Sequence, residues 1–151
     1  MRLFRIADRR HPIWDGTGAA LIGGRWNSPG RPVIYAAASH ACAMLEVLAR
    51  SGIGRVPATH AVVIAEVPDA VNVERANASA LPAGWDAPDS ALSRTFGDAW
   101  LADRRSAVLL VPSVIARHDW NAVVNPQHPE FVRIAVSPPE AVIWDRRLFE
   151  R

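Results

Sequence analysis

Lysine is absent from this chain of 151 residues, and all 17 of its basic side chains are arginines. The absence excludes mechanisms that need a lysine amine, such as Schiff-base formation, a lysine general base or a P-loop lysine. The 17 basic residues nearly balance 15 acidic ones, which leaves a formal net charge of +2. Because this charge is small and the arginines are scattered, we expect no direct binding of nucleic acid.

Cysteine and long apolar segments are also scarce. The single Cys42 excludes an internal disulfide and favours a reducing compartment. No segment approaches the roughly 18–20 apolar residues that a membrane span needs. The first 16 residues carry several charges and lack the apolar stretch of a signal peptide. The sequence therefore predicts a soluble, cytoplasmic protein with no membrane partner.

Motifs for metal binding and for serine hydrolysis are missing as well. The five histidines do not show the HExxH spacing, and no GxSxG segment occurs. Cys42 falls within a predicted helix, where we expect a core residue rather than a nucleophile. Because the histidines lack the spacing of a metal site, we expect no bound metal.

What is present is a globular composition, with 50% hydrophobic and 21% charged residues, which predicts one domain over residues 1–151. Apolar patterning predicts strands over residues 3–6, 33–37, 61–67, 71–73, 107–111, 131–136 and 141–144. Helices are expected over residues 40–51 and 94–104, the first between an N-cap at Ser39 and a stop at Gly52. Residues 14–31 are rich in turns, and residues 77–90 form a long loop. Because strands outnumber helices without regular βαβ order, we expect a single compact α+β domain with mixed or antiparallel sheets.

The segment from Gly23 to Gly30 places an arginine and a tryptophan between glycines. Glycines let a backbone approach a ligand closely, and arginine binds phosphate in a bidentate fork. Arg25 is therefore a candidate anion-binding residue, with Trp26 and Asn27 beside it. The segment matches neither the P-loop nor the GxGxxG pattern, and the alternative is a tight loop with a surface arginine and a core tryptophan.

Two further candidates follow this loop. Tyr35 is the only tyrosine and lies in an apolar strand pattern, so the alternative is a core tyrosine with a satisfied hydroxyl. Glu46 is the only acidic residue of the predicted helix over 40–51. A carboxylate on a largely apolar helix is costly to bury unless it is paired or used. The alternative is a surface ion pair with Arg50, four residues later.

Polar groups near the C-terminal half give weaker signals. Ser113 follows a buried strand pattern, and His128 lies in the turn-like segment over 125–129. A helix cap or a turn would explain either of them.

Taken together, these pieces resemble the RES-domain family, whose name comes from its Arg, Glu and Ser. The resemblance covers almost the whole chain. The matching segments are Arg5 in LFRIA, GGRWNSPGRPVIYAAASHACAMLEVL over 23–48, FGDAWL over 96–101, VPS over 111–113 and NPQHPEF over 125–131.

The resemblance implies a fold similar to mono-ADP-ribosyltransferases and NAD+ as the substrate, cleaved at the nicotinamide–ribose bond. It implies the toxin half of a bacterial toxin–antitoxin pair, whose helix-turn-helix (Xre-type) antitoxin covers the active site. The outcomes it leaves open are NAD+ hydrolysis, phosphorolysis with inorganic phosphate as co-substrate, and ADP-ribosylation of a protein. The catalytic positions fall on Arg25, Tyr35 and Glu46, with Arg5 and Ser113 in support.

The residue types suit that chemistry. Arginines such as Arg5 and Arg25 are expected near a pyrophosphate. A carboxylate at Glu46 would stabilise the oxocarbenium-like ribose, and the Tyr35 ring would stack on nicotinamide. Ser113 would hydrogen-bond the nicotinamide amide or a ribose hydroxyl.

Further substrate-binding candidates are Trp26, Asn27 and His128. Arg50 departs from the family pattern, in which we expect a histidine. It either pairs with Glu46 or points to solvent. The competing hypothesis from another class is a non-catalytic module that binds a nucleotide or a protein.

Overall fold

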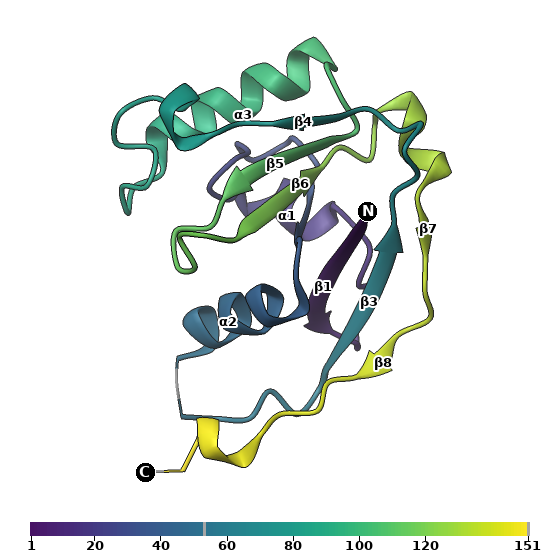
Figure 1. Ribbon diagram of the computed structural model, residues 1–151, viewed down its shortest axis with the longest axis vertical. Helices are drawn as coiled ribbons and strands as arrows, with labels where there is room; N and C mark the ends of the chain where they lie inside the picture. The colour runs from purple at the N-terminus through teal and green to yellow at the C-terminus, as the bar shows by residue number, and fades with distance from the viewer. Residues whose placement is uncertain (53, 151) are drawn as a thin grey trace.

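The computed structural model describes residues 1–52 and 54–150, which build a curled, mixed sheet of eight strands (Figure 1). The strands are β1 (Arg2–Asp8), β2 (Ile34–Ala37), β3 (His60–Glu66), β4 (Val73–Arg75), β5 (Val108–Pro112), β6 (Trp120–Val124), β7 (Ala135–Val136) and β8 (Glu140–Ala141). Their order is β4-β5-β6-β2-β1-β3-β7, and β8 pairs with β3. Among the described strands only the β4–β5 pair is parallel, so the predicted α+β class with a mixed sheet is confirmed.

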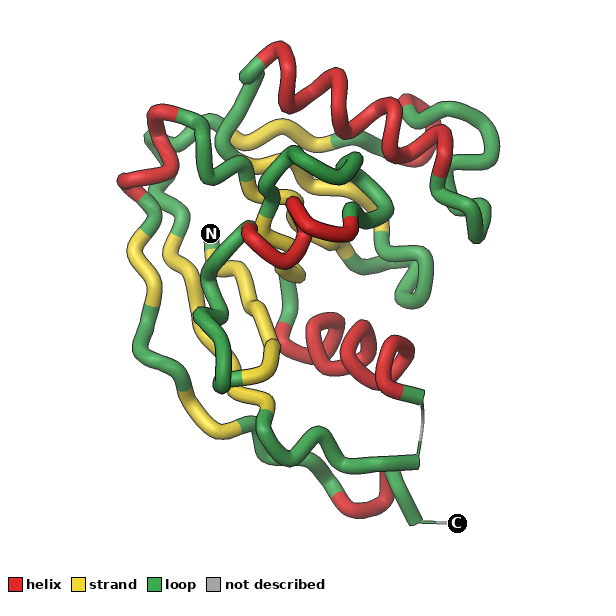
Figure 2. The backbone as a smooth tube through the Cα atoms, turned by 180° about the vertical axis from the view of Figure 1, so that it is seen from behind, coloured by secondary structure: helices red, strands yellow, loops and turns green. Residues whose placement is uncertain are grey.

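The described part of the chain also forms three α-helices: α1 (Thr17–Ile22), α2 (His40–Ser51) and α3 (Ala91–Asp103). Figures 1 and 2, which view the molecule from opposite sides, both show α3 along the β4–β5 end of the sheet and α2 near β1. The 3-10 helices are η1 (Ala78–Ala80), η2 (Pro129–Arg133) and η3 (Arg146–Leu148). Within the described residues, no helix has both the length and the apolar character to cross a bilayer.

Helix α2 matches its sequence prediction at both ends. The Ser39 side chain accepts a hydrogen bond from the Cys42 amide at 3.0 Å, which satisfies one of the free N–H groups of the first turn. Gly52 ends the helix with a positive φ of 73°. The apolar face of α2 packs on strands β1, β2 and β3 through Cys42 and Ala43, so the helix is held firmly against the sheet.

Helix α3 covers a second apolar cluster around Trp100, which is fully buried. Its approach to the turn-rich segment is very close at Gly97. A Cβ added there would lie 1.8 Å from the Trp26 carbonyl oxygen, so only glycine fits without a backbone shift. Asp98, the next residue, accepts hydrogen bonds from the Ser28 amide and hydroxyl. The segment before β2 is thereby fixed to α3.

The structure corrects several predicted elements. The strand expected over 131–136 is wrong in its first half, because His128 caps η2 and Pro129 begins it, leaving only β7 as a strand. The predictions missed β6 and the short helix α1. The expected loop over 77–90 contains only the single turn η1.

Candidate active site

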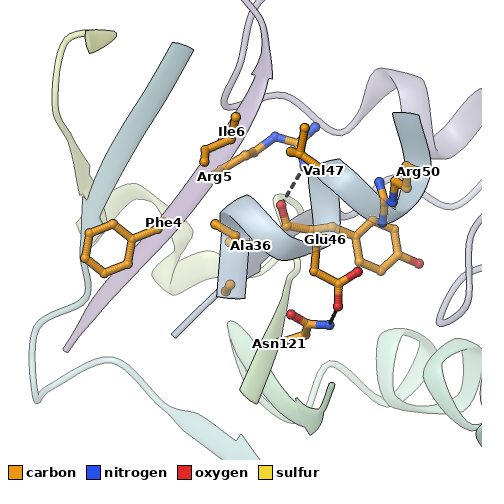
Figure 3. Close-up of a pocket in the computed structure, with 11 residues that line it drawn as sticks. Phe4, Arg5, Ile6, Ala36, Glu46, Val47, Arg50 and Asn121 are labelled. Atoms are coloured by element: carbon orange, nitrogen blue, oxygen red, sulfur yellow. Dashed lines mark hydrogen bonds between the residues drawn. The ribbon is translucent and has the colours of Figure 1, made fainter. Parts of the chain in front are cut away.

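A cleft of about 590 Å³ opens between α2, the loop over 22–26 and the ends of β5 and β6. It continues into a smaller hollow, drawn in Figure 3, between α2 and strands β1 and β2. Five residues line both parts, so the two form one continuous depression. They are Arg5 from β1, Tyr35 from β2, Glu46 and Arg50 from α2, and Asn121 from β6.

The carboxylate of Glu46 is held at one oxygen. Its Oε1 accepts hydrogen bonds from Asn121 Nδ2 at 2.6 Å and from Ser113 Oγ at 3.1 Å. Figure 3 shows the first of these contacts between Glu46 and Asn121. Among the described residues, Glu46 forms no ion pair with Arg50, so the alternative of a surface pair on α2 is wrong. The partners of Glu46 instead come from β6 and from the loop between β5 and β6.

Charge in this cleft is predominantly positive. Arg5, Arg25 and Arg50 line it, and Glu46 is the only carboxylate among its described lining residues. Such a surface suits an anionic ligand, and it leaves a single negative group for chemistry on that ligand.

Arg5 is largely buried beneath the cleft. Its Nε donates to the Ile13 carbonyl at 2.5 Å, and its Nη1 donates to the Tyr35 carbonyl at 2.6 Å. Burial, followed by the charge of Arg50, lowers the pKa of Arg5 to about 10, so it stays cationic at neutral pH. Its guanidinium therefore fixes the backbone of β2 and also contributes positive charge to the site.

Arg25 reaches from the glycine loop to the long loop over 77–90. Its Nη1 donates to the carbonyls of Trp85 at 3.1 Å and Ala87 at 2.9 Å. The side chain thus ties two loops together, and Arg25 also lines the cleft.

Tyr35 anchors the same glycine loop through its hydroxyl. The hydroxyl donates to Asn27 Oδ1 at 2.6 Å and accepts from the Trp26 amide at 3.0 Å. Burial raises the pKa of Tyr35 to about 12, so the phenol stays protonated at neutral pH. The hydroxyl is satisfied within the protein, and the ring remains part of the cleft wall.

The three remaining predicted site residues make contacts with the rest of the protein. Trp26 is only 3% exposed and stacks on Trp85 with ring centroids 6.1 Å apart. Asn27 is fully buried, and its Nδ2 donates to the carbonyls of Ala19 and Arg31. His128 lies outside the cleft lining, where its Nδ1 accepts from the Glu130 amide at the start of η2. These contacts give all three residues roles within the fold.

Asn121 is the site residue that the sequence analysis missed. It sits opposite Ala37 of β2 and Val111 of β5. In the sequence, the pattern that indicates strand β6 is the short apolar run that follows Asn121. The available clue was a polar residue directly before the short apolar run of Ala122, Val123 and Val124. Within the described residues, no group of three or more His, Cys, Asp or Glu side chains has the geometry to hold a metal.

Comparison with known proteins adds to this geometry. The model of the RES domain matches residues 2–145. This chain belongs to the RES-domain family. Among RES-domain relatives, the "Prs ADP-ribosylating toxin" of Sphingobium sp. (strain YBL2) is 40% identical over 140 residues, covering 91% of this chain and 87% of the relative. The "Toxin Res" of Pseudomonas putida is 40% identical over 151 residues, covering 99% of this chain and 100% of the relative.

A solved structure shares the RES fold seen here. It is the crystal structure of the M. tuberculosis MbcT-MbcA toxin-antitoxin complex, with a TM-score of 0.74 and 22% sequence identity. The alignment covers 92% of this chain and 82% of that chain. At this identity the likeness concerns the fold, and it agrees with the family assignment.

Proposed function

We propose that this RES-domain protein is the toxin of a toxin–antitoxin pair and that it consumes NAD+ by cleaving the nicotinamide–ribose bond. The observation that carries the proposal is that Glu46, the single carboxylate among the described lining residues, shares one cleft with three arginines. NAD+ combines a pyrophosphate, which arginines bind, with a glycosidic bond that breaks through a positively charged ribose. The names of the relatives, which include an ADP-ribosylating toxin and Toxin Res proteins, support the same conclusion.

In this mechanism the arginines bind and orient the dinucleotide. Arg25 and Arg50 line the cleft, and Arg5 adds charge from beneath. The Tyr35 ring stacks on the nicotinamide and limits its orientations. Because nicotinamide leaves as a neutral molecule, no general acid is needed for its departure.

Glu46 acts where positive charge develops. As the bond between the nicotinamide nitrogen and ribose C1 breaks, the ribose becomes oxocarbenium-like. The Glu46 carboxylate stabilises this charge and accepts a hydrogen bond from a ribose hydroxyl. Water, phosphate or a protein side chain then bonds to C1, and the attacking group loses its proton.

The assay that tests this function follows NAD+ with the purified protein by NMR, with and without inorganic phosphate. We expect nicotinamide release in at least one condition. Release that requires phosphate identifies a phosphorylase, with ADP-ribose 1″-phosphate as product, and release without phosphate identifies a hydrolase. If NAD+ stays intact under every condition while the protein is folded, the enzyme proposal is wrong and a non-catalytic nucleotide-binding module replaces it.

ADP-ribosylation of a protein is the second candidate, favoured by the relative from Sphingobium that carries this activity in its name. It predicts that NAD+ is consumed only when a cell lysate supplies the acceptor. Labelled NAD+ would then leave its ADP-ribose on a protein band, whereas hydrolysis or phosphorolysis leaves the label in small molecules.

We also propose an antitoxin of the helix-turn-helix type as the partner that covers this cleft. Two apolar side chains at its rim are open to solvent, Ile22 at 82% and Ile115 at 42% exposure. A covering protein would bury them and gain the corresponding hydrophobic free energy. We expect an equimolar antitoxin, encoded beside the toxin, to suppress NAD+ cleavage. An antitoxin that binds tightly without slowing cleavage would contradict coverage of the site.

A further inference from the structure

We propose that Asn121 is a positioning residue, which holds one carboxylate oxygen of Glu46 so that the other faces the substrate, and that Cys42 helps to fix the orientation of the Asn121 amide. The inference deepens the proposed function and rests on it for its catalytic meaning. The arrangement that carries it is a chain of hydrogen bonds from Cys42 through Asn121 to Glu46.

Ser113 has one proton to give, and Glu46 receives it. The Ser113 Oγ accepts hydrogen bonds from the amides of Ile115 at 3.2 Å and Ala116 at 2.9 Å. A hydroxyl has two acceptor sites and one donor, so its proton remains for Glu46 Oε1. Ser113 is also fully buried. Its contacts therefore place it behind the carboxylate, as a support for Glu46 rather than as a group that touches substrate.

Asn121 must present its NH2 group, and not its oxygen, toward Glu46. The Cys42 thiol lies 3.5 Å from Asn121 Oδ1, in the geometry of an S–H donor to that oxygen. Burial raises the pKa of Cys42 to about 11, which keeps the thiol protonated at neutral pH. A reversed amide would set its oxygen against the Glu46 carboxylate and lose that hydrogen bond, and it would replace the S–H···O contact with a weak N–H···S contact.

The backbone brings these three groups together. Cys42 and Glu46 are four residues apart on α2, so they project from the same side of the helix. Asn121 of β6 is paired opposite Ala37 of β2 and faces that side. One amide thus contacts two side chains of α2, and its position is set by the register of the sheet.

As a consequence, the two oxygens of the Glu46 carboxylate have different contacts. Both protein donors bind Oε1, and among the described residues Oε2 accepts no hydrogen bond. Oε2 is therefore the oxygen available to a ribose hydroxyl. A carboxylate anchored at one oxygen is oriented before substrate arrives, which lowers the cost of reaching the reactive arrangement.

The first test compares Asn121→Asp with Asn121→Leu, two side chains of similar size. In Asn121→Asp, two carboxyl groups face each other and share a proton, so at low pH the acid still donates to Glu46 and at higher pH both ionise and repel. We expect kcat of this variant to fall about tenfold or more as pH rises from 5 to 8, with KM for NAD+ changed little. Asn121→Leu removes the hydrogen-bond donor without adding a group that titrates. Its kcat should therefore fall below that of the wild type by about the same factor at every pH. The charged and titratable groups that surround the pair are Arg5, Tyr35, Cys42, Arg50 and Asp119.

If the Asn121→Asp variant follows the wild-type pH profile, or if both variants keep the wild-type kcat, the inference is overturned. A second readout needs no turnover. The midpoint of thermal unfolding of Asn121→Asp should fall relative to Asn121→Leu by at least about 2–4 °C as pH rises through this range. The carboxyl pair that shares the proton has a higher pKa in the folded state than in the unfolded state. The shared proton therefore stabilises the fold at low pH, and this stabilisation is lost as pH rises. Adding Glu46→Gln should abolish the fall, and a fall that persists would overturn the pairing.

Cys42 provides a matched pair of variants. Cys42→Ala removes the donor to Asn121, whereas Cys42→Ser keeps one in nearly the same place. We expect Cys42→Ala to lower kcat severalfold and Cys42→Ser to lower it less; equal effects would overturn the role of the thiol. Wild-type protein that releases no nicotinamide would refute the proposed function, while the thermal measurements would still decide the pairing of Asn121 with Glu46.

Discussion

Replacing Glu46 by glutamine is expected to slow NAD+ cleavage by roughly 10²–10³-fold with little change in NAD+ affinity. The amide keeps the shape of the carboxylate, and its oxygen can still accept from Ser113 and Asn121. What it lacks is the negative charge that, in the proposed mechanism, stabilises the oxocarbenium-like ribose. Because that charge acts mainly on the transition state, the loss should fall on kcat. Initial rates of nicotinamide release, measured by NMR across NAD+ concentrations, separate kcat from KM.

Glu140→Gln is a suitable control, since Glu140 lies on the exposed strand β8 and outside the cleft lining. It makes the same chemical change and should leave the rate near that of the wild type. A Glu46→Gln protein that retains more than about a tenth of the wild-type kcat would contradict a catalytic role for the carboxylate.

Gly97→Ala is expected to lower the free energy of unfolding by about 3 kcal/mol or more. The new Cβ would lie 1.8 Å from the Trp26 carbonyl oxygen and 2.7 Å from its carbonyl carbon. Both atoms belong to the backbone, so α3 and the glycine loop must separate to make room. In an open helix the same change would stabilise by up to about 1 kcal/mol, because alanine is the better helix former. The sign of the effect therefore reports the close contact.

Urea denaturation followed by circular dichroism measures this free energy. Gly18→Ala is the matched control, since Gly18 lies in α1 and a Cβ there meets no atom within 4 Å. We expect it to leave stability unchanged or to raise it by up to about 1 kcal/mol. A Gly97→Ala protein as stable as the wild type would show that the two elements are not packed so closely.

Local signals explain which elements could be predicted from the sequence. The helix over 40–51 has a serine cap, an apolar face and a terminal glycine, and α2 follows them from His40 to Ser51. The first half of the strand expected over 131–136 failed because Phe131 and Val132 favour strands while the turn at Pro129 takes the chain into η2. Helix α1 was missed because its six residues bury no side chain and therefore show no apolar periodicity.

The candidate site was predictable in part for a similar reason. Arg25, Tyr35 and Glu46 lie within one short stretch of sequence, and the structure brings all three to one cleft. Their catalytic roles remain predictions. The contact between Glu46 and Asn121 spans 75 residues and depends on the pairing of β2 with β6, which no local pattern reveals. His128, by contrast, was chosen from a motif, and the structure places it at the start of η2.

The strand order has a consequence for the newly made chain. Strand β2 is translated early, but its neighbour β6 follows only at Trp120–Val124, and β6 also joins β5 to the rest of the sheet. A nascent chain that ends before Ser113 already contains Glu46 but has neither of the side chains that hold its carboxylate. Assembly of the site therefore waits until most of the protein has left the ribosome. An interrupted translation product lacks both of these supports, so the site that we propose for catalysis forms only in a nearly complete chain.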